Sequence, residues 1–399
     1  MRDISGYFDW AATAPTDNDI IQESQDIAAD FFANPSSQHK KGLEAKQKLS
    51  QARQTVANTL AVPIETIFFT SGGTEANHIP LLSLLRRPAK GSVVISAIEH
   101  PSVREQAEML KHCGWKIIPA EVDTRGIVTA QAVEKALAGD TVLVCVMAVN
   151  NETGAIQPIY EIADMLFRHA TQSGKRRVKL HVDCVQAAGK IPFALNHKGI
   201  DSAAFSAHKI GGPRGIGILY LSQKIDPFLK GGGQESGIRS GTENLYGAWA
   251  VAKCMEKYFI PCKNDKTPAD SPQAVRYNAQ TKATQKFMEQ ILATNKCKII
   301  PEQRTSPSES RNFSPWIVQA AFDGIPGEAM VRSLSERGFY ISTGSACSAK
   351  KLNRPVLEAM GIPKEDMTNA VRFSFGHRTE ERDMERLVEV IKEVLVSLV

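Results

Sequence analysis

The stretches TVLVCVMAV, residues 141–149, and VKLHVD, residues 178–183, are short β-rich runs separated by a helical pattern. Runs this short, bounded by polar residues, predict strands of a sheet that is covered on both faces. Helical patterns lie between such runs; in residues 45–60, for example, small and apolar side chains recur at spacings of three and four. The alternation predicts an α/β fold with a mostly parallel sheet and helices on both faces. The other runs of this type are residues 67–70, 92–96, 202–207 and 216–221.

The pattern changes near residue 258. Residues 259–273 are rich in proline and polar residues, which indicates a linker or a surface excursion. Beyond them we predict a smaller α+β domain. Its elements are helices at 274–294 and 327–337, strands at 339–342 and 370–375, and a final amphipathic helix with Met384, Leu387, Val388, Ile391, Val394, Leu395 and Leu398 on one face. The predicted division is a large domain, residues 16–258, and a small domain, residues 1–15 plus 259–399.

The composition is that of an ordinary globular protein. Of 399 residues, 42% are hydrophobic and 23% are charged, with a net charge of +5. The seven cysteines include no CxxC pair, which argues against a disulfide framework, a zinc ribbon or a cluster-binding site, and we expect no metal site. The sequence carries no signal-peptide pattern and no apolar run long enough to span a bilayer, so we expect a soluble, cytoplasmic protein with no membrane partner. The basic run KRRVK, residues 175–179, is typical of a solvated turn, so nucleic acid is not a required partner.

Polar residues follow the predicted strands, and in an open α/β sheet ligands bind at the carboxyl ends of the strands. After residues 67–70 comes SGGTE, whose two glycines expose N–H groups before a helix and so suit a phosphate. The alternative is a plain turn capped by Ser71 or Thr74. His100 follows the next strand, in the sequence EHP. It is either an acid–base or ring-stacking group or an ordinary loop histidine.

Asp183 and Lys209 stand at the ends of apolar strands, where charged side chains are costly. The carboxylate of Asp183 needs a partner. That partner is either an arginine of the core or the protonated nitrogen of a pyridine ring, the interaction that lets pyridoxal phosphate (PLP) act as an electron sink. Lys209 lies between His208 and a glycine run. It is either a solvated lysine or an amine that forms a Schiff base.

Two glycine clusters differ from nucleotide-binding motifs. GGPRGIG, residues 211–217, lacks the GxGxxG spacing and precedes a strand, and the chain contains no GxxxxGK[ST]. The second cluster, GGGQESGIRSGT at residues 231–242, is either a flexible turn or a phosphate-contacting loop.

Cys347 and Arg372 are the candidate reactive and anion-binding residues of the last third. Cys347 lies in STGSACSAKK, residues 342–351, where small residues and following lysines favour a reactive thiolate. The alternative is a structural thiol. Arg372 interrupts an apolar strand and needs an anion, which is either a core carboxylate or a bound carboxylate ligand.

In order and at fitting intervals, these segments resemble the cysteine desulfurases of the class V aminotransferase-like family of PLP enzymes, in particular the iron–sulfur-assembly branch. The resemblance covers about the whole chain. It rests on FTSGGTEAN, EHPSV, NNETG, HVDCVQ, SAHKIGGPRGIG, GGGQESGIRSGTEN, STGSACSA and VRFSFG. It implies the PLP-dependent aminotransferase-like (type I) fold, PLP as cofactor and a homodimer.

The resemblance also implies the role of each residue. Lys209 would hold PLP as a Schiff base and shuttle the substrate proton, while the Cys347 thiolate would take the sulfur of L-cysteine as a persulfide and L-alanine would leave. Asp183 would pair with the ring nitrogen, Gln186 would bond the ring hydroxyl, and His100 would stack on the ring. The phosphate would be bound by Gly73, Thr74, Ser206 and His208, with Thr242 of the neighbouring subunit, and the substrate carboxylate by Arg372, Asn151 and Asn34.

The sulfur would pass to a protein acceptor, either a cluster scaffold or a sulfur carrier. One alternative is another PLP reaction on the same fold, such as a selenocysteine lyase or an aminotransferase, with Cys347 dispensable. A second is a binding protein that kept the fold without the activity. The STGSAC loop favours a desulfurase. A protein without catalysis is opposed by the joint presence of five residues: Lys209, Asp183, His100, Arg372 and Cys347.

Overall fold

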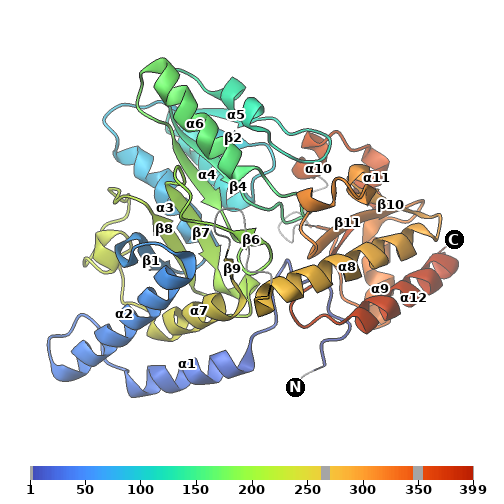
Figure 1. The fold of residues 1–399 in the computed structure, drawn as a ribbon, viewed down its shortest axis with the longest axis horizontal. Coiled ribbons are helices and arrows are strands. Elements are labelled where there is room, and N and C mark those ends of the chain that lie inside the picture. The colour runs from blue at the N-terminus through green and yellow to red at the C-terminus, as the bar shows by residue number, and fades with distance from the viewer. Residues whose placement is uncertain (1–2, 262–269, 345–353, 399) are drawn as a thin grey trace.

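The computed structural model describes residues 3–261, 270–344 and 354–398. Its centre is a seven-stranded sheet of order β1-β8-β7-β5-β4-β2-β3 (Figure 1). Only β8 among these strands runs against its neighbours, which confirms the predicted mostly parallel sheet. The strands are β1 Ile67–Thr70, β2 Ser92–Ser96, β3 Lys116–Ala120, β4 Thr141–Met147, β5 Lys179–Asp183, β7 Ser202–Ser206 and β8 Gly217–Leu221.

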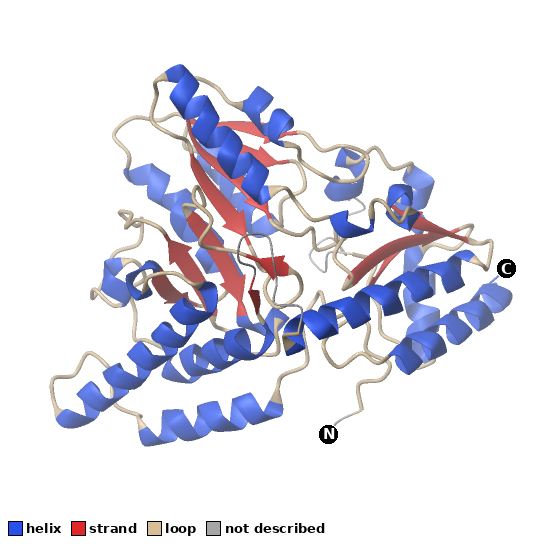
Figure 2. Ribbon diagram, viewed as in Figure 1, coloured by secondary structure: helices blue, strands red, loops and turns tan. Residues whose placement is uncertain are grey.

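Helices cover both faces of this sheet (Figure 2). They are α1 Asn18–Asp30, α2 Lys40–Leu60, α3 Gly73–Ser83, α4 Pro101–His112, α5 Ala130–Ala136, α6 Ile159–Ser173 and α7 Leu245–Tyr258. Successive residues of one strand serve opposite faces, because side chains alternate along a strand. In β2, Val93 and Ile95 pack in the core with α3 and α4, whereas Val94 packs in the core with α2, α6 and α7. The continuous apolar runs therefore reflect burial on both sides.

A second, three-stranded antiparallel sheet has the order β10-β11-β12 and its own core. Its strands are β10 Cys297–Ile300, β11 Ile317–Phe322 and β12 Ala370–Ser374, and its helices are α8 Pro272–Leu292, α9 Gly327–Glu336, α10 Pro355–Ala359, α11 Lys364–Asn369 and α12 Glu381–Leu398. The N-terminal segment joins this core through Phe8 and Ala11, although it is far away in sequence. A small parallel pair, β6 Pro192–Phe193 and β9 Ile260–Pro261, lies outside both sheets.

The structure differs from the sequence prediction at several points, and β10 and β11 of the second sheet, like the short pair β6 and β9, were not predicted. Residues 339–342 form isolated bridges at Tyr340 and Ser342 instead of a ladder strand. Leu398 is 42% exposed and does not share the buried face of α12, because it lies in the last turn, past the end of the core. β3 was not predicted, because it lies at the edge of the sheet and its first residue, Lys116, is exposed. No helix in the described part of the chain combines the length and the hydropathy that a bilayer span requires.

Candidate active site

A cavity of about 250 Å³ lies at the carboxyl ends of β4, β5 and β7. The start of α3, the start of α4, the N-terminal segment and β12 complete its wall. This is the sheet edge at which the sequence predicted a ligand site. The cavity brings together ten predicted site residues: Gly73, Thr74, His100, Asn151, Asp183, Gln186, Ser206, His208, Lys209 and Arg372.

Lys209 ends a short 3-10 helix, Ala207–Lys209, that directly follows β7. Its Nζ donates to the backbone carbonyls of Ala11 and Ala12 at 2.6 and 2.8 Å. These two residues belong to the N-terminal segment, which is anchored in the second core. The amine is therefore held at the cavity wall where the two cores meet, and it is not a solvated surface lysine.

Asp183 is 5% exposed, and no arginine of the described chain pairs with it. Its Oδ2 accepts from Asn77 Nδ2 at 2.8 Å and its Oδ1 accepts from the backbone N–H of Val185 at 2.9 Å. The core-arginine alternative for Asp183 is thus not found. Two neutral donors leave the carboxylate further acceptor capacity toward the cavity.

Asn77 connects Asp183 to His100 through hydrogen bonds. The chemistry of its partners determines which atoms donate and which accept. A carboxylate only accepts, so the amide nitrogen of Asn77 faces Asp183; its second N–H donates to Ser102 Oγ at 2.8 Å. The Ser102 backbone N–H donates to His100 Nδ1 at 3.1 Å, and the Ser102 hydroxyl lies 2.9 Å from the same nitrogen. Nδ1 is therefore an acceptor. His100 is neutral with its proton on Nε2, and burial lowers its pKa in the same sense.

His181 forms a hydrogen bond with the side-chain oxygen of Asn77. It is fully buried, and burial lowers its pKa to about 3, so the ring is neutral. Its Nε2 lies 2.9 Å from Asn77 Oδ1, which must accept, and its Nδ1 lies 2.8 Å from Ser202 Oγ. The hydrogen bonds then form one chain: Ser202 donates to His181, His181 donates to Asn77, and Asn77 donates to Asp183. A branch leads from Asn77 through Ser102 to His100.

The start of α3 forms one end of the cavity. α3 has no side-chain cap, so the alternative of a turn capped by Ser71 or Thr74 is not found. Gly73 is required for close packing, because a Cβ at this position would lie 2.7 Å from Val185 Cγ2. Uncapped N–H groups beside the hydroxyls of Thr74 and Ser206 make this end suitable for an anion.

His208 lies near the same end and bonds the N-terminal segment. Its Nδ1 lies 3.1 Å from Thr13 Oγ1. Burial and the neighbouring Lys209 lower its pKa to about 4, so the imidazole is neutral at physiological pH.

Arg372 forms the other end of the cavity and is 1% exposed. Its Nη2 pairs with Asp9 Oδ1 at 2.7 Å, and its Nη1 donates to the Asn151 carbonyl at 2.9 Å. The Nε atom has no hydrogen-bond partner among the described residues. Arg372 therefore makes a core ion pair and still has donor capacity for a bound carboxylate.

Two buried ionisable residues beside the cavity were not predicted. Glu99, next to His100, accepts from Ser96 Oγ and from the backbone N–H of Met147, and burial raises its pKa to about 8. Lys190 Nζ bonds Gln186 Oε1, and burial lowers the pKa of Lys190 well below its usual value. The EHP sequence could have drawn attention to Glu99. Nothing local distinguishes Lys190 from a solvated lysine.

Three predicted residues are not part of this cavity. Asn34 is exposed, and its side chain accepts from the backbone N–H of Ser36 at 2.9 Å. Thr242 is also exposed on this chain. Cys347 lies outside the described residues; the last described residue before it, Gly344, packs against Arg354 and Glu152. The described residues contain no group of three His, Cys, Asp or Glu side chains that could hold a metal ion.

The residues present fit PLP. The cavity offers a lysine amine, a carboxylate without a cationic partner, a neutral imidazole and a helix N-terminus that suits a phosphate. The lysine amine matches the aldehyde of the cofactor, and the carboxylate matches its ring nitrogen. The imidazole matches the face of the ring, and the helix N-terminus matches the phosphate. Fold and site thus define an α/β enzyme of the PLP-dependent class.

Comparisons with known proteins agree with this class. The chain belongs to the aminotransferase class-V family, whose sequence profile matches residues 6–387. It is 35% identical over 97% of its length to a NifS/IcsS protein homolog of Lactobacillus delbrueckii subsp. bulgaricus, of which it covers 96%. It is 30% identical over 98% of its length to the cysteine desulfurase IscS of Dictyoglomus turgidum, of which it covers 95%. The solved structure of a NifS-like protein superimposes with a TM-score of 0.84 at 32% identity, covering 98% of this chain and 99% of that one.

Proposed function

We propose that this chain is a PLP-dependent cysteine desulfurase, which converts L-cysteine to L-alanine and leaves the sulfur on Cys347. The observation that carries the proposal is the convergence of Lys209, Asp183, His100 and Arg372 on one cavity. Family membership and the resemblance to named cysteine desulfurases support the choice of substrate.

When bound, PLP supplies an electron sink for the carbon that loses a proton. Lys209 holds the cofactor and then moves the proton at the substrate Cα, since its amine sits at the cavity wall. Asp183 accepts from the protonated ring nitrogen, and Gln186 donates to the ring hydroxyl. The neutral His100 packs on the ring without adding a positive charge beside the pyridinium.

The two ends of the cavity orient the ligands. Gly73, Thr74, Ser206 and His208 bind the cofactor phosphate, and Arg372 with Asn151 binds the substrate carboxylate. The Cys347 thiolate attacks the substrate sulfur. A new S–S bond forms, the C–S bond breaks, and the carbon keeps the electron pair and is protonated to give L-alanine.

The remaining assignments concern assembly. The chain acts as a homodimer in which Thr242 of one subunit reaches the phosphate site of the other; its exposure on the single chain leaves it available. Asn34, which is exposed on the single chain, contributes to substrate binding. A large domain, residues 16–258, and a small domain, residues 1–15 plus 259–399, divide the chain between its two main cores. The sulfur passes from Cys347 to a cluster scaffold or sulfur carrier in the cytoplasm.

The test is a product assay on PLP-loaded protein given L-cysteine and a thiol reductant. The wild type is expected to form alanine and sulfide in equal amounts. Cys347→Ser should retain the absorbance of the lysine-bound cofactor but form neither product. Cys113→Ser, at a half-buried cysteine outside the cavity, is the matched control and should act like the wild type. Equal activity of Cys347→Ser and the wild type would contradict the proposal.

A further inference from the structure

A second cavity, of about 540 Å³, lies at the opposite edge of the seven-stranded sheet from the candidate active site. β4 and β5 connect the two cavities. Val142 and Lys179, at or near the starts of these strands, line the second cavity, whereas Met147 and Asp183, at their ends, line the first. At about 3.3 Å per residue, Lys179 and Asp183 are separated by roughly 13 Å. We call the second cavity the basic cleft.

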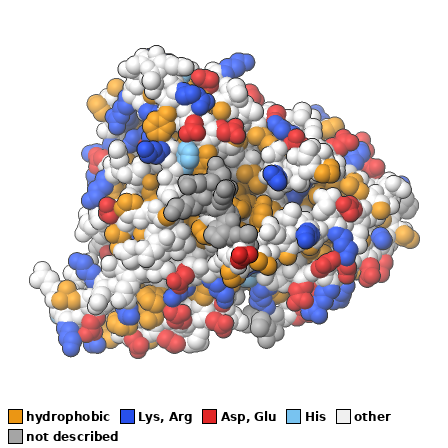
Figure 3. Space-filling model, in the orientation of Figure 1, with side chains coloured by type: hydrophobic (Ala, Val, Ile, Leu, Met, Phe, Trp, Pro, Cys, Tyr) orange, Lys and Arg blue, Asp and Glu red, His pale blue; other side chains and the backbone are white. Residues whose placement is uncertain are grey.

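The basic cleft has an unusual balance of charge. Its described lining contains one carboxylate, Asp140, against six basic side chains and His169; the six are Arg87, Lys90, Lys175, Arg176, Arg177 and Lys179. The whole chain has 48 basic and 43 acidic residues, so the excess is local. On the face drawn in Figure 3, both signs of charge are interspersed.

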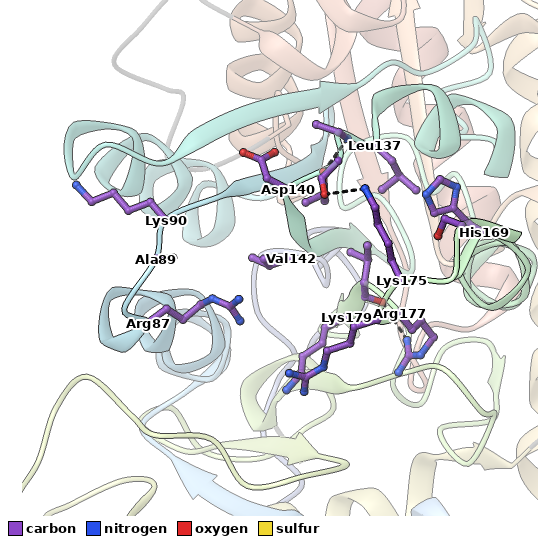
Figure 4. Close-up of a pocket in the computed structure, with 16 residues that line it drawn as sticks. Arg87, Ala89, Lys90, Leu137, Asp140, Val142, His169, Lys175, Arg177 and Lys179 are labelled. Atoms are coloured by element: carbon purple, nitrogen blue, oxygen red, sulfur yellow. Dashed lines mark hydrogen bonds between the residues drawn. The ribbon is translucent and has the colours of Figure 1, made fainter. Parts of the chain in front are cut away.

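Some of these charges already have partners. Arg177 Nη2 pairs with Asp201 Oδ1 at 2.8 Å, and Asp140 accepts from Ser92 Oγ at 2.9 Å. Lys90 Nζ lies against Gly114, and the amine points away from the other cations of the cleft (Figure 4). Lys175 Nζ has only a long contact, 3.4 Å, to the Gly139 carbonyl.

The other cations have no such partner. Arg87, Arg176 and Lys179 form no ion pair with any carboxylate of the described chain. Arg87 lies on one wall of the cleft, and Lys175 and Lys179 lie on the other, with Val142 between them (Figure 4). Like charges gathered around a hollow repel one another, and a multivalent anion placed between them removes that repulsion.

We propose that the basic cleft binds a compact polyanion with adjacent phosphoryl groups, either the triphosphate chain of a nucleotide or inorganic tripolyphosphate. Guanidinium and ammonium groups are the usual ligands of phosphoryl oxygens. A concave volume of about 540 Å³ suits a small molecule. The cations come from two separate segments that converge on it: the connection between α3 and β2, and the α6–β5 loop with the first residue of β5. The short basic run alone would be a solvated turn; Arg87 on the opposite wall makes it one side of a site.

The test is calorimetric titration of the PLP-loaded protein with sodium tripolyphosphate, ATP and orthophosphate. Loading with PLP fills the phosphate end of the candidate active site, so any binding there is suppressed. Tripolyphosphate is expected to bind, more weakly as salt is raised, and orthophosphate is expected to bind at least about tenfold more weakly because it meets fewer cations. Equal affinity for ATP and tripolyphosphate would identify the phosphate chain as the ligand, and tighter binding of ATP would identify a nucleotide.

A matched pair of double variants assigns the binding to the cleft. Arg87→Gln with Lys179→Gln should weaken tripolyphosphate at least about tenfold, by loss of two charge-assisted contacts. Lys40→Gln with Lys46→Gln, on the exposed face of α2, changes the net charge equally and should alter affinity less than about twofold. Equal weakening in both double variants would overturn the proposal. So would binding of a polyglutamate peptide without any binding of tripolyphosphate, because the cleft would then serve an acidic protein.

Discussion

Replacing Asn77 by Ala tests the buried hydrogen-bond network behind the cofactor site. Asn77 is 1% exposed and makes one bond to the Asp183 carboxylate and two to neutral groups, Ser102 Oγ and His181 Nε2, all at 2.8–2.9 Å. A bond to a charged group contributes about 1.5–3 kcal/mol and a neutral bond about 0.5–1.5 kcal/mol. The variant should therefore lose about 2.5–6 kcal/mol of unfolding free energy, because the partners stay buried and lose their hydrogen bonds.

The assay is urea unfolding of the PLP-free protein followed by circular dichroism. Asn58→Ala, an exposed position on α2, is the matched control and should change the free energy by less than about 0.5 kcal/mol. Asn77→Ala should also release PLP about tenfold more readily, since Asp183 loses one of its two donors. If Asn77→Ala matched Asn58→Ala in both unfolding free energy and PLP release, the hydrogen bonds of Asn77 would contribute neither to stability nor to cofactor binding.

The network also predicts a proton position in the wild type. His100 should appear as the Nε2–H tautomer by nitrogen NMR of the histidine rings, because Nδ1 accepts from Ser102. A proton on Nδ1 would refute the arrangement of donors derived for Asn77.

Three further predictions concern other parts of the site. The pKa of Glu99 is about 8 in the folded state and 4.5 as its ordinary value, so the folded protein holds a proton that the unfolded chain releases between these pH values. The unfolding free energy of the wild type should therefore fall more steeply than that of Glu99→Gln as pH rises from about 4.5 to 8. Denaturant unfolding at a series of pH values measures this, and parallel curves for the two proteins would exclude the proposed protonation of Glu99. Gly73→Ala should raise the dissociation constant for PLP at least tenfold, because its Cβ would lie 2.7 Å from Val185, and an unchanged constant from absorbance titration would contradict that packing. Arg372→Lys should raise KM for L-cysteine more than it lowers kcat, because lysine lacks the planar guanidinium that can bind Asp9 and the substrate carboxylate together. An unchanged KM would show that Arg372 does not bind the substrate.

The sheet and its ligand-binding edge could be predicted because their signals are local. Most of the central strands are short apolar runs, and Asp183 and Lys209 lie directly at or after strand ends. The one missed strand of the large sheet, β3, begins with the exposed Lys116 and so lacks the continuous apolar run.

The interior network could not be predicted from local patterns. Asn77 lies 25 residues from Ser102, 104 from His181 and 106 from Asp183, and only the packed fold brings them together. Lys190 is buried against expectation for a lysine, because Gln186 and the surrounding core enclose it.

Detection of the sulfur on the protein tests the central claim most directly. The PLP-loaded protein is mixed with L-cysteine without reductant, trapped with an alkylating agent, digested and examined by mass spectrometry. The account predicts one additional sulfur atom on the peptide that contains Cys347, formed together with one L-alanine, and no added sulfur in Lys209→Ala. Alanine formed without any sulfur on Cys347, or sulfur gained equally by Lys209→Ala, would contradict it.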